Sequence, residues 1–190
     1  VRHPERVPSF FTKEEVLRIE NSIARSNAVG KRNYAMTLLA SRLGLRASDI
    51  ANLKFGEIDW DNNLLTITMQ KTRKVIQLPL LAEVGNSIVD YLKNGRPKSS
   101  LDQVFLSSRA PYTGATKACV CAAINEIILK SGVDVHLKHH GPHSLRHSLA
   151  SAMLSEETTL PVISESLGHR HTDTTMVYLK IDIPSLMKCA

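Results

Sequence analysis

Cysteine is scarce in this sequence, whose 190 residues include only Cys119, Cys121 and Cys189. Such an odd, low count excludes a disulfide-stapled scaffold and favours a reduced compartment. Long hydrophobic runs are also missing, because no stretch approaches the ~18 consecutive apolar residues of a membrane span. The N-terminal residues lack the apolar segment of a signal peptide. We therefore expect a cytoplasmic protein without a membrane segment.

The composition is otherwise that of a globular domain with a modest excess of positive charge. Hydrophobic residues make up 43% of the chain, which is enough for a core, and the length suits one domain. Lys and Arg outnumber Asp and Glu by 24 to 18, and charges cancel beyond residue 135, so the net +6 lies in residues 1–135. This imbalance favours a polyanionic partner. Seven of the eight histidines lie between His136 and His171.

Local patterns predict a mainly helical α+β fold. Thr12 and Glu15 form a capping box that opens a helix to about residue 26. Helical spacing and glycine stops predict further helices over about 31–43, 47–53, 82–93, 116–131, 142–154, 159–167 and 173–179. Alternation at Leu65, Ile67 and Met69 predicts a strand, flanked by strands near 58–60 and 75–79. We expect a helical bundle with a small three-stranded antiparallel sheet.

Two arginines lie near predicted helix N-termini, which favour the binding of an anion. His143 and Arg146 are three residues apart near a predicted helix N-terminus, so their side chains share a face. Arg46 lies at the junction of two predicted helices, and Asp49 follows it by three residues. Taken singly, each pattern is weak evidence, and an ordinary surface pair of His143 and Arg146 is the more common case.

Three further residues are candidates for a functional site, although each also has a more common, non-functional explanation. Lys71 lies in the basic turn between two predicted strands, where a lysine is usually solvated. His169 follows Leu167-Gly168 directly after a helix stop, as a solvated turn histidine also would. Tyr178 follows nine residues later on a predicted short helix, where packing is the common role.

In this order and spacing, however, the set resembles the catalytic residues of the tyrosine recombinases, or phage-integrase family. The strings Gly-Leu-Arg-x-Ser-Asp, His-Ser-Leu-Arg-His-Ser, Leu-Gly-His and Thr-Met-Val-Tyr agree, and the resemblance covers nearly the whole chain. It implies six catalytic residues and one supporting residue, Asp49, which stands where Glu is common. The six are Arg46, Lys71, His143, Arg146, His169 and Tyr178. It also implies a linker over residues 1–11 from a missing N-terminal DNA-binding domain, a catalytic domain over 12–190 and a C-terminal tail from about 181.

The resemblance implies a site-specific DNA recombinase or integrase that works through a 3′-phosphotyrosyl intermediate, without metal, ATP or another cofactor. Tyr178 would be the nucleophile and Lys71 the general acid. His143 would be the base, and His169 would donate a hydrogen bond to a phosphate oxygen. The two arginines would neutralise the transition state, because guanidinium matches phosphate geometry.

The expected partner is double-stranded DNA. The resemblance implies a homotetramer on paired sites and accessory factors that bend DNA or set direction. Free in solution, the chain is expected to be a monomer. A bacterial or mobile-element protein associated with the nucleoid is expected. Candidate contacts to the DNA backbone are Arg73, Lys74, Lys93, Arg96, Lys98 and Lys117.

Three rival interpretations compete with this one. His143 and His147 have the i, i+4 spacing of helical zinc ligands, but position 144 is Ser and no HExxH motif is present. A non-catalytic DNA-binding module would not need all six catalytic-type residues. A type IB topoisomerase shares the covalent tyrosine chemistry, but the short chain and the close local strings favour a recombinase.

Overall fold

The computed structural model describes residues 10–136, 138–156 and 158–168. The elements in chain order are α1 (Lys13–Asn21), α2 (Ala28–Arg42), α3 (Ala47–Ala51), the 3-10 turn η1 (Phe55–Glu57), β1 (Ile58–Asp59), β2 (Leu64–Thr68), β3 (Val75–Pro79), α4 (Ala82–Asn94), α5 (Lys117–Lys130), α6 (Pro142–Ser155) and α7 (Leu160–Ser166). The predicted fold class, a helical domain with a small antiparallel sheet, is confirmed.

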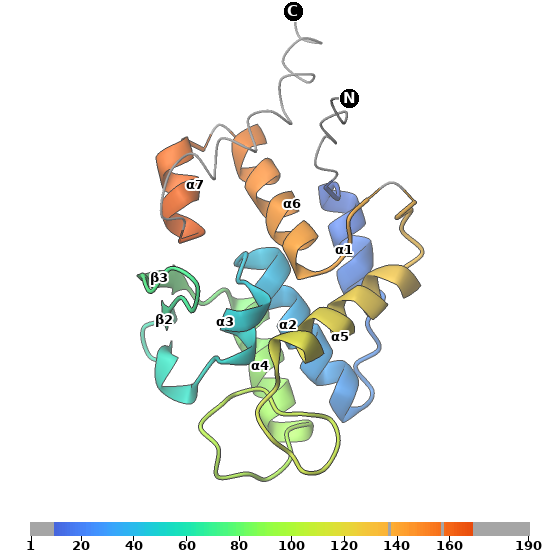
Figure 1. The fold of residues 1–190 in the computed structure, drawn as a ribbon, viewed down its shortest axis with the longest axis vertical. Coiled ribbons are helices and arrows are strands. Elements are labelled where there is room, and N and C mark those ends of the chain that lie inside the picture. The colour runs from blue at the N-terminus through green and yellow to red at the C-terminus, as the bar shows by residue number, and fades with distance from the viewer. Residues whose placement is uncertain (1–9, 137, 157, 169–190) are drawn as a thin grey trace, which may run out of the picture.

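Helix α2 is the centre of the bundle. It contacts α1, α3, α4, α5 and α6, which surround it in Figure 1. Its middle is buried on nearly all sides, as expected of a helix enclosed by others rather than one with a single apolar face. The main core continues from this helix into α4, α5 and the inner face of the sheet. The central helix thereby holds the surrounding elements in fixed relation to one another.

The three strands form an antiparallel meander in the order β1-β2-β3. Leu65 pairs with Leu78 and Ile67 with Ile76, and these inward-facing residues alternate with exposed ones. This period-2 pattern places one face of the sheet on the core. Helix α7 lies beside β3 and α6, where Ala150, Ile163 and Leu167 form a small second core. The sheet thus joins the bundle through the main core, and α7 links β3 to α6.

Most helix boundaries follow the sequence signals. The Thr12–Glu15 capping box is present, and Pro142 occupies the first turn of α6. Gly44 has φ +63°, a conformation that glycine adopts without strain, and a Cβ there would meet the Leu167 side chain at 2.6 Å. This glycine therefore both ends α2 and lets α7 approach it.

Two predicted boundaries were wrong. Helix α1 ends at Asn21 rather than near residue 26, because Ser22 caps it and its hydroxyl donates to the Ile19 carbonyl. Helix α2 begins at Ala28, three residues earlier than predicted, because the Asn27 side chain accepts from the Gly30 amide as an N-cap. Short polar side chains that bond locally decide both ends.

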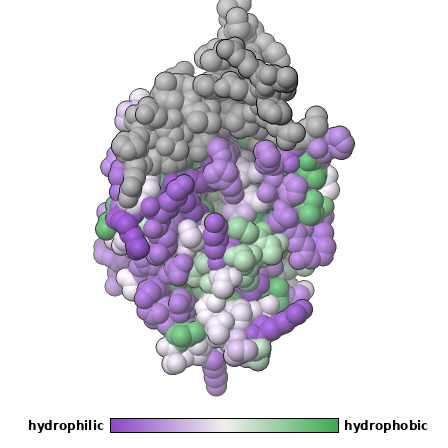
Figure 2. All heavy atoms as spheres, in the orientation of Figure 1, coloured by the Kyte–Doolittle hydropathy of each residue, from purple (hydrophilic) through white to green (hydrophobic). Residues whose placement is uncertain are grey.

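Several sequence predictions concern residues outside the described ones. They are the greater part of the 1–11 linker, the helix over 173–179 and the tail from about 181. Within the described ranges, no helix combines the length and apolarity that crossing a membrane requires. The face drawn in Figure 2 is mostly hydrophilic, with small hydrophobic areas between.

Candidate functional site

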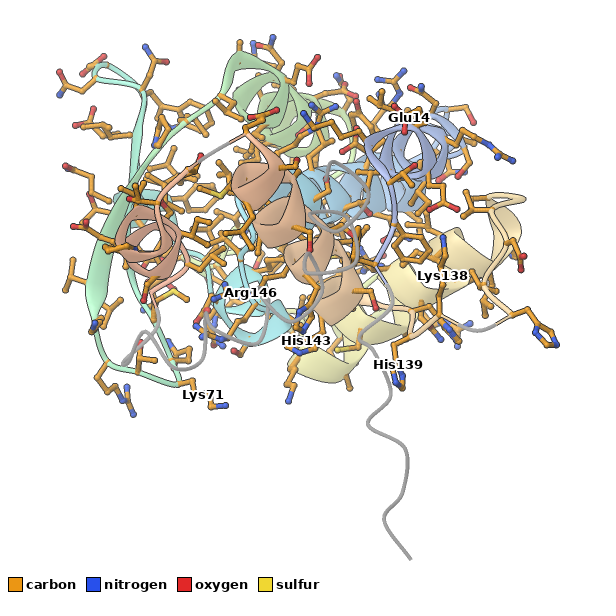
Figure 3. All side chains as sticks on the ribbon, turned by 90° about the horizontal axis from the view of Figure 1, so that it is seen from above. Glu14, Lys71, Lys138, His139, His143 and Arg146 are labelled. Carbon is orange, nitrogen blue, oxygen red and sulfur yellow. The ribbon has the colours of Figure 1, made fainter. Side chains whose placement is uncertain are left out.

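A groove of about 1020 Å³ opens where α3, the β2–β3 turn, α5 and α6 meet. Arg46, Lys71, His143 and Arg146 all line it, although up to 100 residues separate them in sequence. In Figure 3, Lys71, His143 and Arg146 lie along one side of the molecule, with His139 beside His143. The structure therefore brings together the four described members of the predicted catalytic set.

Arg146 is the best-anchored of these side chains. It is 2% exposed, and its two terminal nitrogens donate to the carbonyls of Gly44 and Leu167. The Gly44 carbonyl lies just after the C-terminus of α2, and the Leu167 carbonyl lies just after that of α7. The guanidinium of Arg146, on α6, therefore links three helices. The guanidinium also lines the groove, where its planar fork of N–H donors matches the geometry of an oxyanion. Its position is thus set before any ligand binds.

Arg46 offers an unsatisfied donor in the same groove. It is the N-cap residue of α3 and is half-buried. Its Nη1 atom is buried and makes no hydrogen bond to any residue that the structure describes. A buried N–H without a partner costs free energy, so a site of this kind favours an acceptor from outside. A phosphate oxygen has the charge and geometry to supply it.

Asp49 connects this arginine to the hairpin. The buried carboxylate accepts the Gln70 amide N–H at 2.8 Å, one residue before Lys71. Burial raises the pKa of Asp49, although the Gln70 hydrogen bond and the charges of Arg46 and Arg146 act to lower it. The predicted supporting residue thus fixes the start of the Lys71 turn. The Lys71 side chain itself is exposed and lines the groove.

This anchoring is testable without any DNA. Replacing Asp49 with alanine is expected to speed hydrogen exchange at the Gln70 amide about tenfold, because the lost hydrogen bond is worth ~1.5 kcal/mol and ~1.4 kcal/mol is a factor of ten. Nuclear magnetic resonance measures that exchange. Asp49→Asn is the matched control, since its amide oxygen still accepts and should keep the rate within about threefold. Equal exchange in Asp49→Ala and the wild type would refute the anchoring.

Two histidines one turn apart on α6 are in contact, and the first of them, His143, lines the groove. The Nε2 atoms of His143 and His147 are 2.7 Å apart, and the rings are edge to face. Desolvation lowers the pKa of His143, and the positive charges of Arg146, Arg46 and Lys71 lower it further. Burial, together with the charges of His143 and Arg146, lowers the pKa of His147 to about 4. Both rings are therefore mainly neutral at pH 7.

The last two predicted catalytic residues, His169 and Tyr178, lie outside the described residues. The chain is described as far as Gly168, where an added Cβ would touch Met69 and Ile76 of the hairpin at 3.3 Å. Leu167, just before it, is held by Arg146. The described part of the chain thus ends beside the β2–β3 hairpin and α6, which both contribute to the groove.

The six predicted backbone contacts fall in different places. Lys117 lines the groove, and Arg73 and Lys74 are exposed on the hairpin turn. Lys93 and Arg96 line a second cavity of about 400 Å³. Arg96 also donates to the carbonyls of loop residues 101, 103 and 104, which gives it a structural task. Lys98 is exposed in the loop after α4. Their contacts with DNA stay predictions.

The groove also contains residues that sequence analysis assigned no role. They are Gln70, Cys121, Asn125, Lys138, His139 and His140. Lys138 is held by Glu15 of α1, with Nζ 2.6 Å from the carboxylate, and lies over the Phe11 ring. Cys121 and Asn125 follow Lys117 at intervals of four on α5, a spacing that marks one helix face and could have revealed them. Among the described residues, no three His, Cys, Asp or Glu side chains are grouped for metal binding.

Comparisons with solved structures show the same fold. The XerA recombinase structure matches with a TM-score of 0.80 and 20% identity, covering 99% of this chain and 64% of that one. XerH, in a structure described as bound to palindromic difH substrate after cleavage, also matches with a TM-score of 0.80. It is 22% identical, over 96% of this chain and 52% of that chain.

Comparisons of sequence show the family. A putative integrase/recombinase of Sinorhizobium fredii (strain NBRC 101917 / NGR234), y4rA, is 38% identical over 97% of this chain but 44% of its own length. Another from that strain, y4gC, is 31% identical over 97% of this chain and 95% of its own. Tyrosine recombinase XerA of Thermococcus kodakarensis is 31% identical, and the chain spans 62% of it. The pattern of the Phage integrase family matches residues 9–183. The chain therefore belongs to the phage integrase family.

Proposed function

We propose that this chain cuts and rejoins DNA strands as the catalytic part of a site-specific recombinase. The observation that carries the proposal is the convergence of Arg46 and Arg146 in one groove, one firmly anchored and the other with a buried unsatisfied donor. A phosphodiester gains negative charge on its nonbridging oxygens in the transition state. Preorganised cationic donors at that point are the largest source of stabilisation. Family membership supports the same assignment.

In the proposed reaction, the Tyr178 oxygen attacks the phosphorus and the bond to the 5′-oxygen breaks. The phenol proton passes to His143, and Lys71 gives a proton to the leaving 5′-oxygen. His169 donates a hydrogen bond to a phosphate oxygen. A 5′-hydroxyl of a second strand then attacks the phosphotyrosine, and the proton transfers reverse. The number of phosphoester bonds is conserved, so the exchange needs no ATP.

The proposal extends to partners and domains. Double-stranded DNA is the substrate, and residues 12–190 are the catalytic unit. Four copies assemble on two paired sites, whereas the chain without DNA is a monomer. Accessory proteins that bend DNA would assist. Light scattering of the chain with and without DNA tests this assembly, and a stable tetramer in the absence of DNA would contradict it.

A salt titration tests whether the groove holds the DNA backbone. Replacing Lys117 with alanine is expected to make the slope of log K against log salt shallower by about one, because one phosphate contact and its released counterion are lost. Fluorescence anisotropy with a labelled duplex measures the slope. Lys130→Ala is the matched control, since Lys130 lies at the other end of α5, outside the groove lining and paired with Glu126, and its slope should equal the wild type. Equal slopes for both variants would place the DNA elsewhere.

The covalent intermediate can be tested without knowing the target sequence. The probe is a pool of nicked duplexes with randomised sequence around the nick, in which a cleaved strand diffuses away and traps the enzyme on DNA. A protein–DNA adduct stable in detergent is expected, and sequencing its DNA yields a preferred duplex for later assays. A pool that gives no adduct while the protein binds duplex DNA would contradict the proposed cleavage.

A further inference from the structure

The contact between His143 and His147 requires that the two rings share one proton. Their Nε2 atoms are 2.7 Å apart. At that distance two lone pairs or two N–H groups would repel each other, so one nitrogen donates and the other accepts. The tautomer of each ring therefore depends on that of the other. The contact occupies the Nε2 atom of His143, so its Nδ1 atom is the nitrogen that can face a substrate.

The electrostatic surroundings oppose a positive charge on either ring. The charged and titratable groups that act on the pair are Arg146 on α6, Arg46 on α3, Lys71 on the hairpin and His139 before α6. Asp49 is the acidic group behind Arg46 and Arg146. Burial and these charges lower the pKa of His147 to about 4. His147 is thus a neutral ring, which is able to accept a hydrogen bond from His143 without becoming charged.

We propose that His147 is a positioning residue that accepts the Nε2–H of His143 and so keeps the Nδ1 lone pair of His143 available as the catalytic base. This inference rests on the proposed function, which makes His143 the acceptor of the Tyr178 proton. When Nδ1 takes that proton, an imidazolium forms. Its Nε2–H stays bonded to the neutral His147, and the proton on Nδ1 returns to the tyrosine oxygen in the second step. The principle is that of a base whose tautomer is set by the hydrogen bond at its other nitrogen.

The rate of adduct formation should respond to this hydrogen bond. Replacing His147 with phenylalanine removes the acceptor, so we expect a tenfold to hundredfold slower reaction, the range for a hydrogen bond to a charged group of ~1.5–3 kcal/mol. Glutamine can place an amide oxygen where Nε2 lies, so His147→Gln should recover most of the rate. His136→Phe is the matched control, because His136 is exposed and outside the groove lining, and it should react as the wild type does.

Nuclear magnetic resonance provides the decisive readout on the chain without DNA. Two-bond ¹H–¹⁵N correlation spectra of histidine-labelled protein report the tautomer of each ring, and the His143 signals are assigned by their loss in His143→Gln. We expect the wild type to carry the His143 proton on Nε2. His147→Phe should give a mixture of tautomers, and His147→Gln should restore the Nε2–H form.

Each outcome decides a separate point. A wild-type His143 protonated on Nδ1, or one whose tautomer does not change in His147→Phe, overturns the inference, and the first result needs no variant that folds. If His143→Gln forms adduct as fast as the wild type, the proposed role of His143 as base fails, whatever the tautomer. A slow His147→Phe variant with an unchanged tautomer would show only a packing role for His147.

Discussion

Replacing Tyr178 with phenylalanine is expected to abolish the covalent protein–DNA adduct while leaving DNA affinity unchanged. The substitution removes one oxygen, the proposed nucleophile, and no other side chain in the proposed mechanism can replace it. The adduct is measured on denaturing gels with the preferred nicked duplex, and affinity is measured by fluorescence anisotropy. The expected adduct yield falls below detection, the largest effect of any substitution considered.

The other tyrosines supply the control. Tyr112 is exposed in the loop before α5, so Tyr112→Phe makes the same chemical change away from the groove and should form adduct normally. Tyr91 is buried in the core, where burial raises the pKa of its hydroxyl and makes it a poor nucleophile. Adduct that persists in Tyr178→Phe would assign the attack to another residue, which peptide mapping of the adduct would then identify.

Replacing Arg146 with alanine is expected to slow cleavage by about 10²–10³, the usual effect of losing one preorganised donor at a developing charge. The same change leaves the carbonyls of Gly44 and Leu167 without their donor. We therefore also expect a loss of ~1–3 kcal/mol in the free energy of unfolding. Single-turnover cleavage and urea denaturation measure the two effects separately.

Arg32 separates lost stability from lost chemistry. It is also buried, and its guanidinium donates to the Leu106 carbonyl at 3.0 Å, but it lies on the second cavity rather than the groove. Arg32→Ala should lower the unfolding free energy by a similar amount and still cleave normally at a temperature where it is folded. Cleavage by Arg146→Ala at the wild-type rate would remove this arginine from the catalytic site.

The local signals in the sequence predicted most of the secondary structure, because caps and periodicity act over a few residues. The Thr12–Glu15 box, Pro142 at the start of α6 and the alternation along β2 each appear as predicted. The ends that were misplaced, at Asn21 and Ala28, each depend on one side-chain hydrogen bond, which the Ser22 hydroxyl donates at the first and the Asn27 amide oxygen accepts at the second. Such bonds compete closely with one more helical turn, so pattern alone does not decide them.

Part of the candidate site was also predictable. The spacing of His143 and Arg146 placed both near one helix end, and the resemblance added Arg46 and Lys71. The roles of Asp49 as the anchor of Gln70 and of Lys138 as a groove residue held by Glu15 were not predicted. Both contacts join elements distant in sequence, and no local period reports them.

The sequence by itself determined the helices, the hairpin, the family resemblance and the excess of positive charge in residues 1–135, because each is a property of neighbouring residues or of composition. Only the tertiary structure decided that Arg46, Lys71 and Arg146 share one groove, since that depends on the packing of α3, the hairpin and α6 around α2. It also decided that Arg46 has a buried N–H donor without a partner among the described residues, whereas the guanidinium of Arg96 donates to backbone carbonyls of the loop after α4. Burial and hydrogen-bond partners are set by contacts across the fold, so identical side chains acquire different chemistry there.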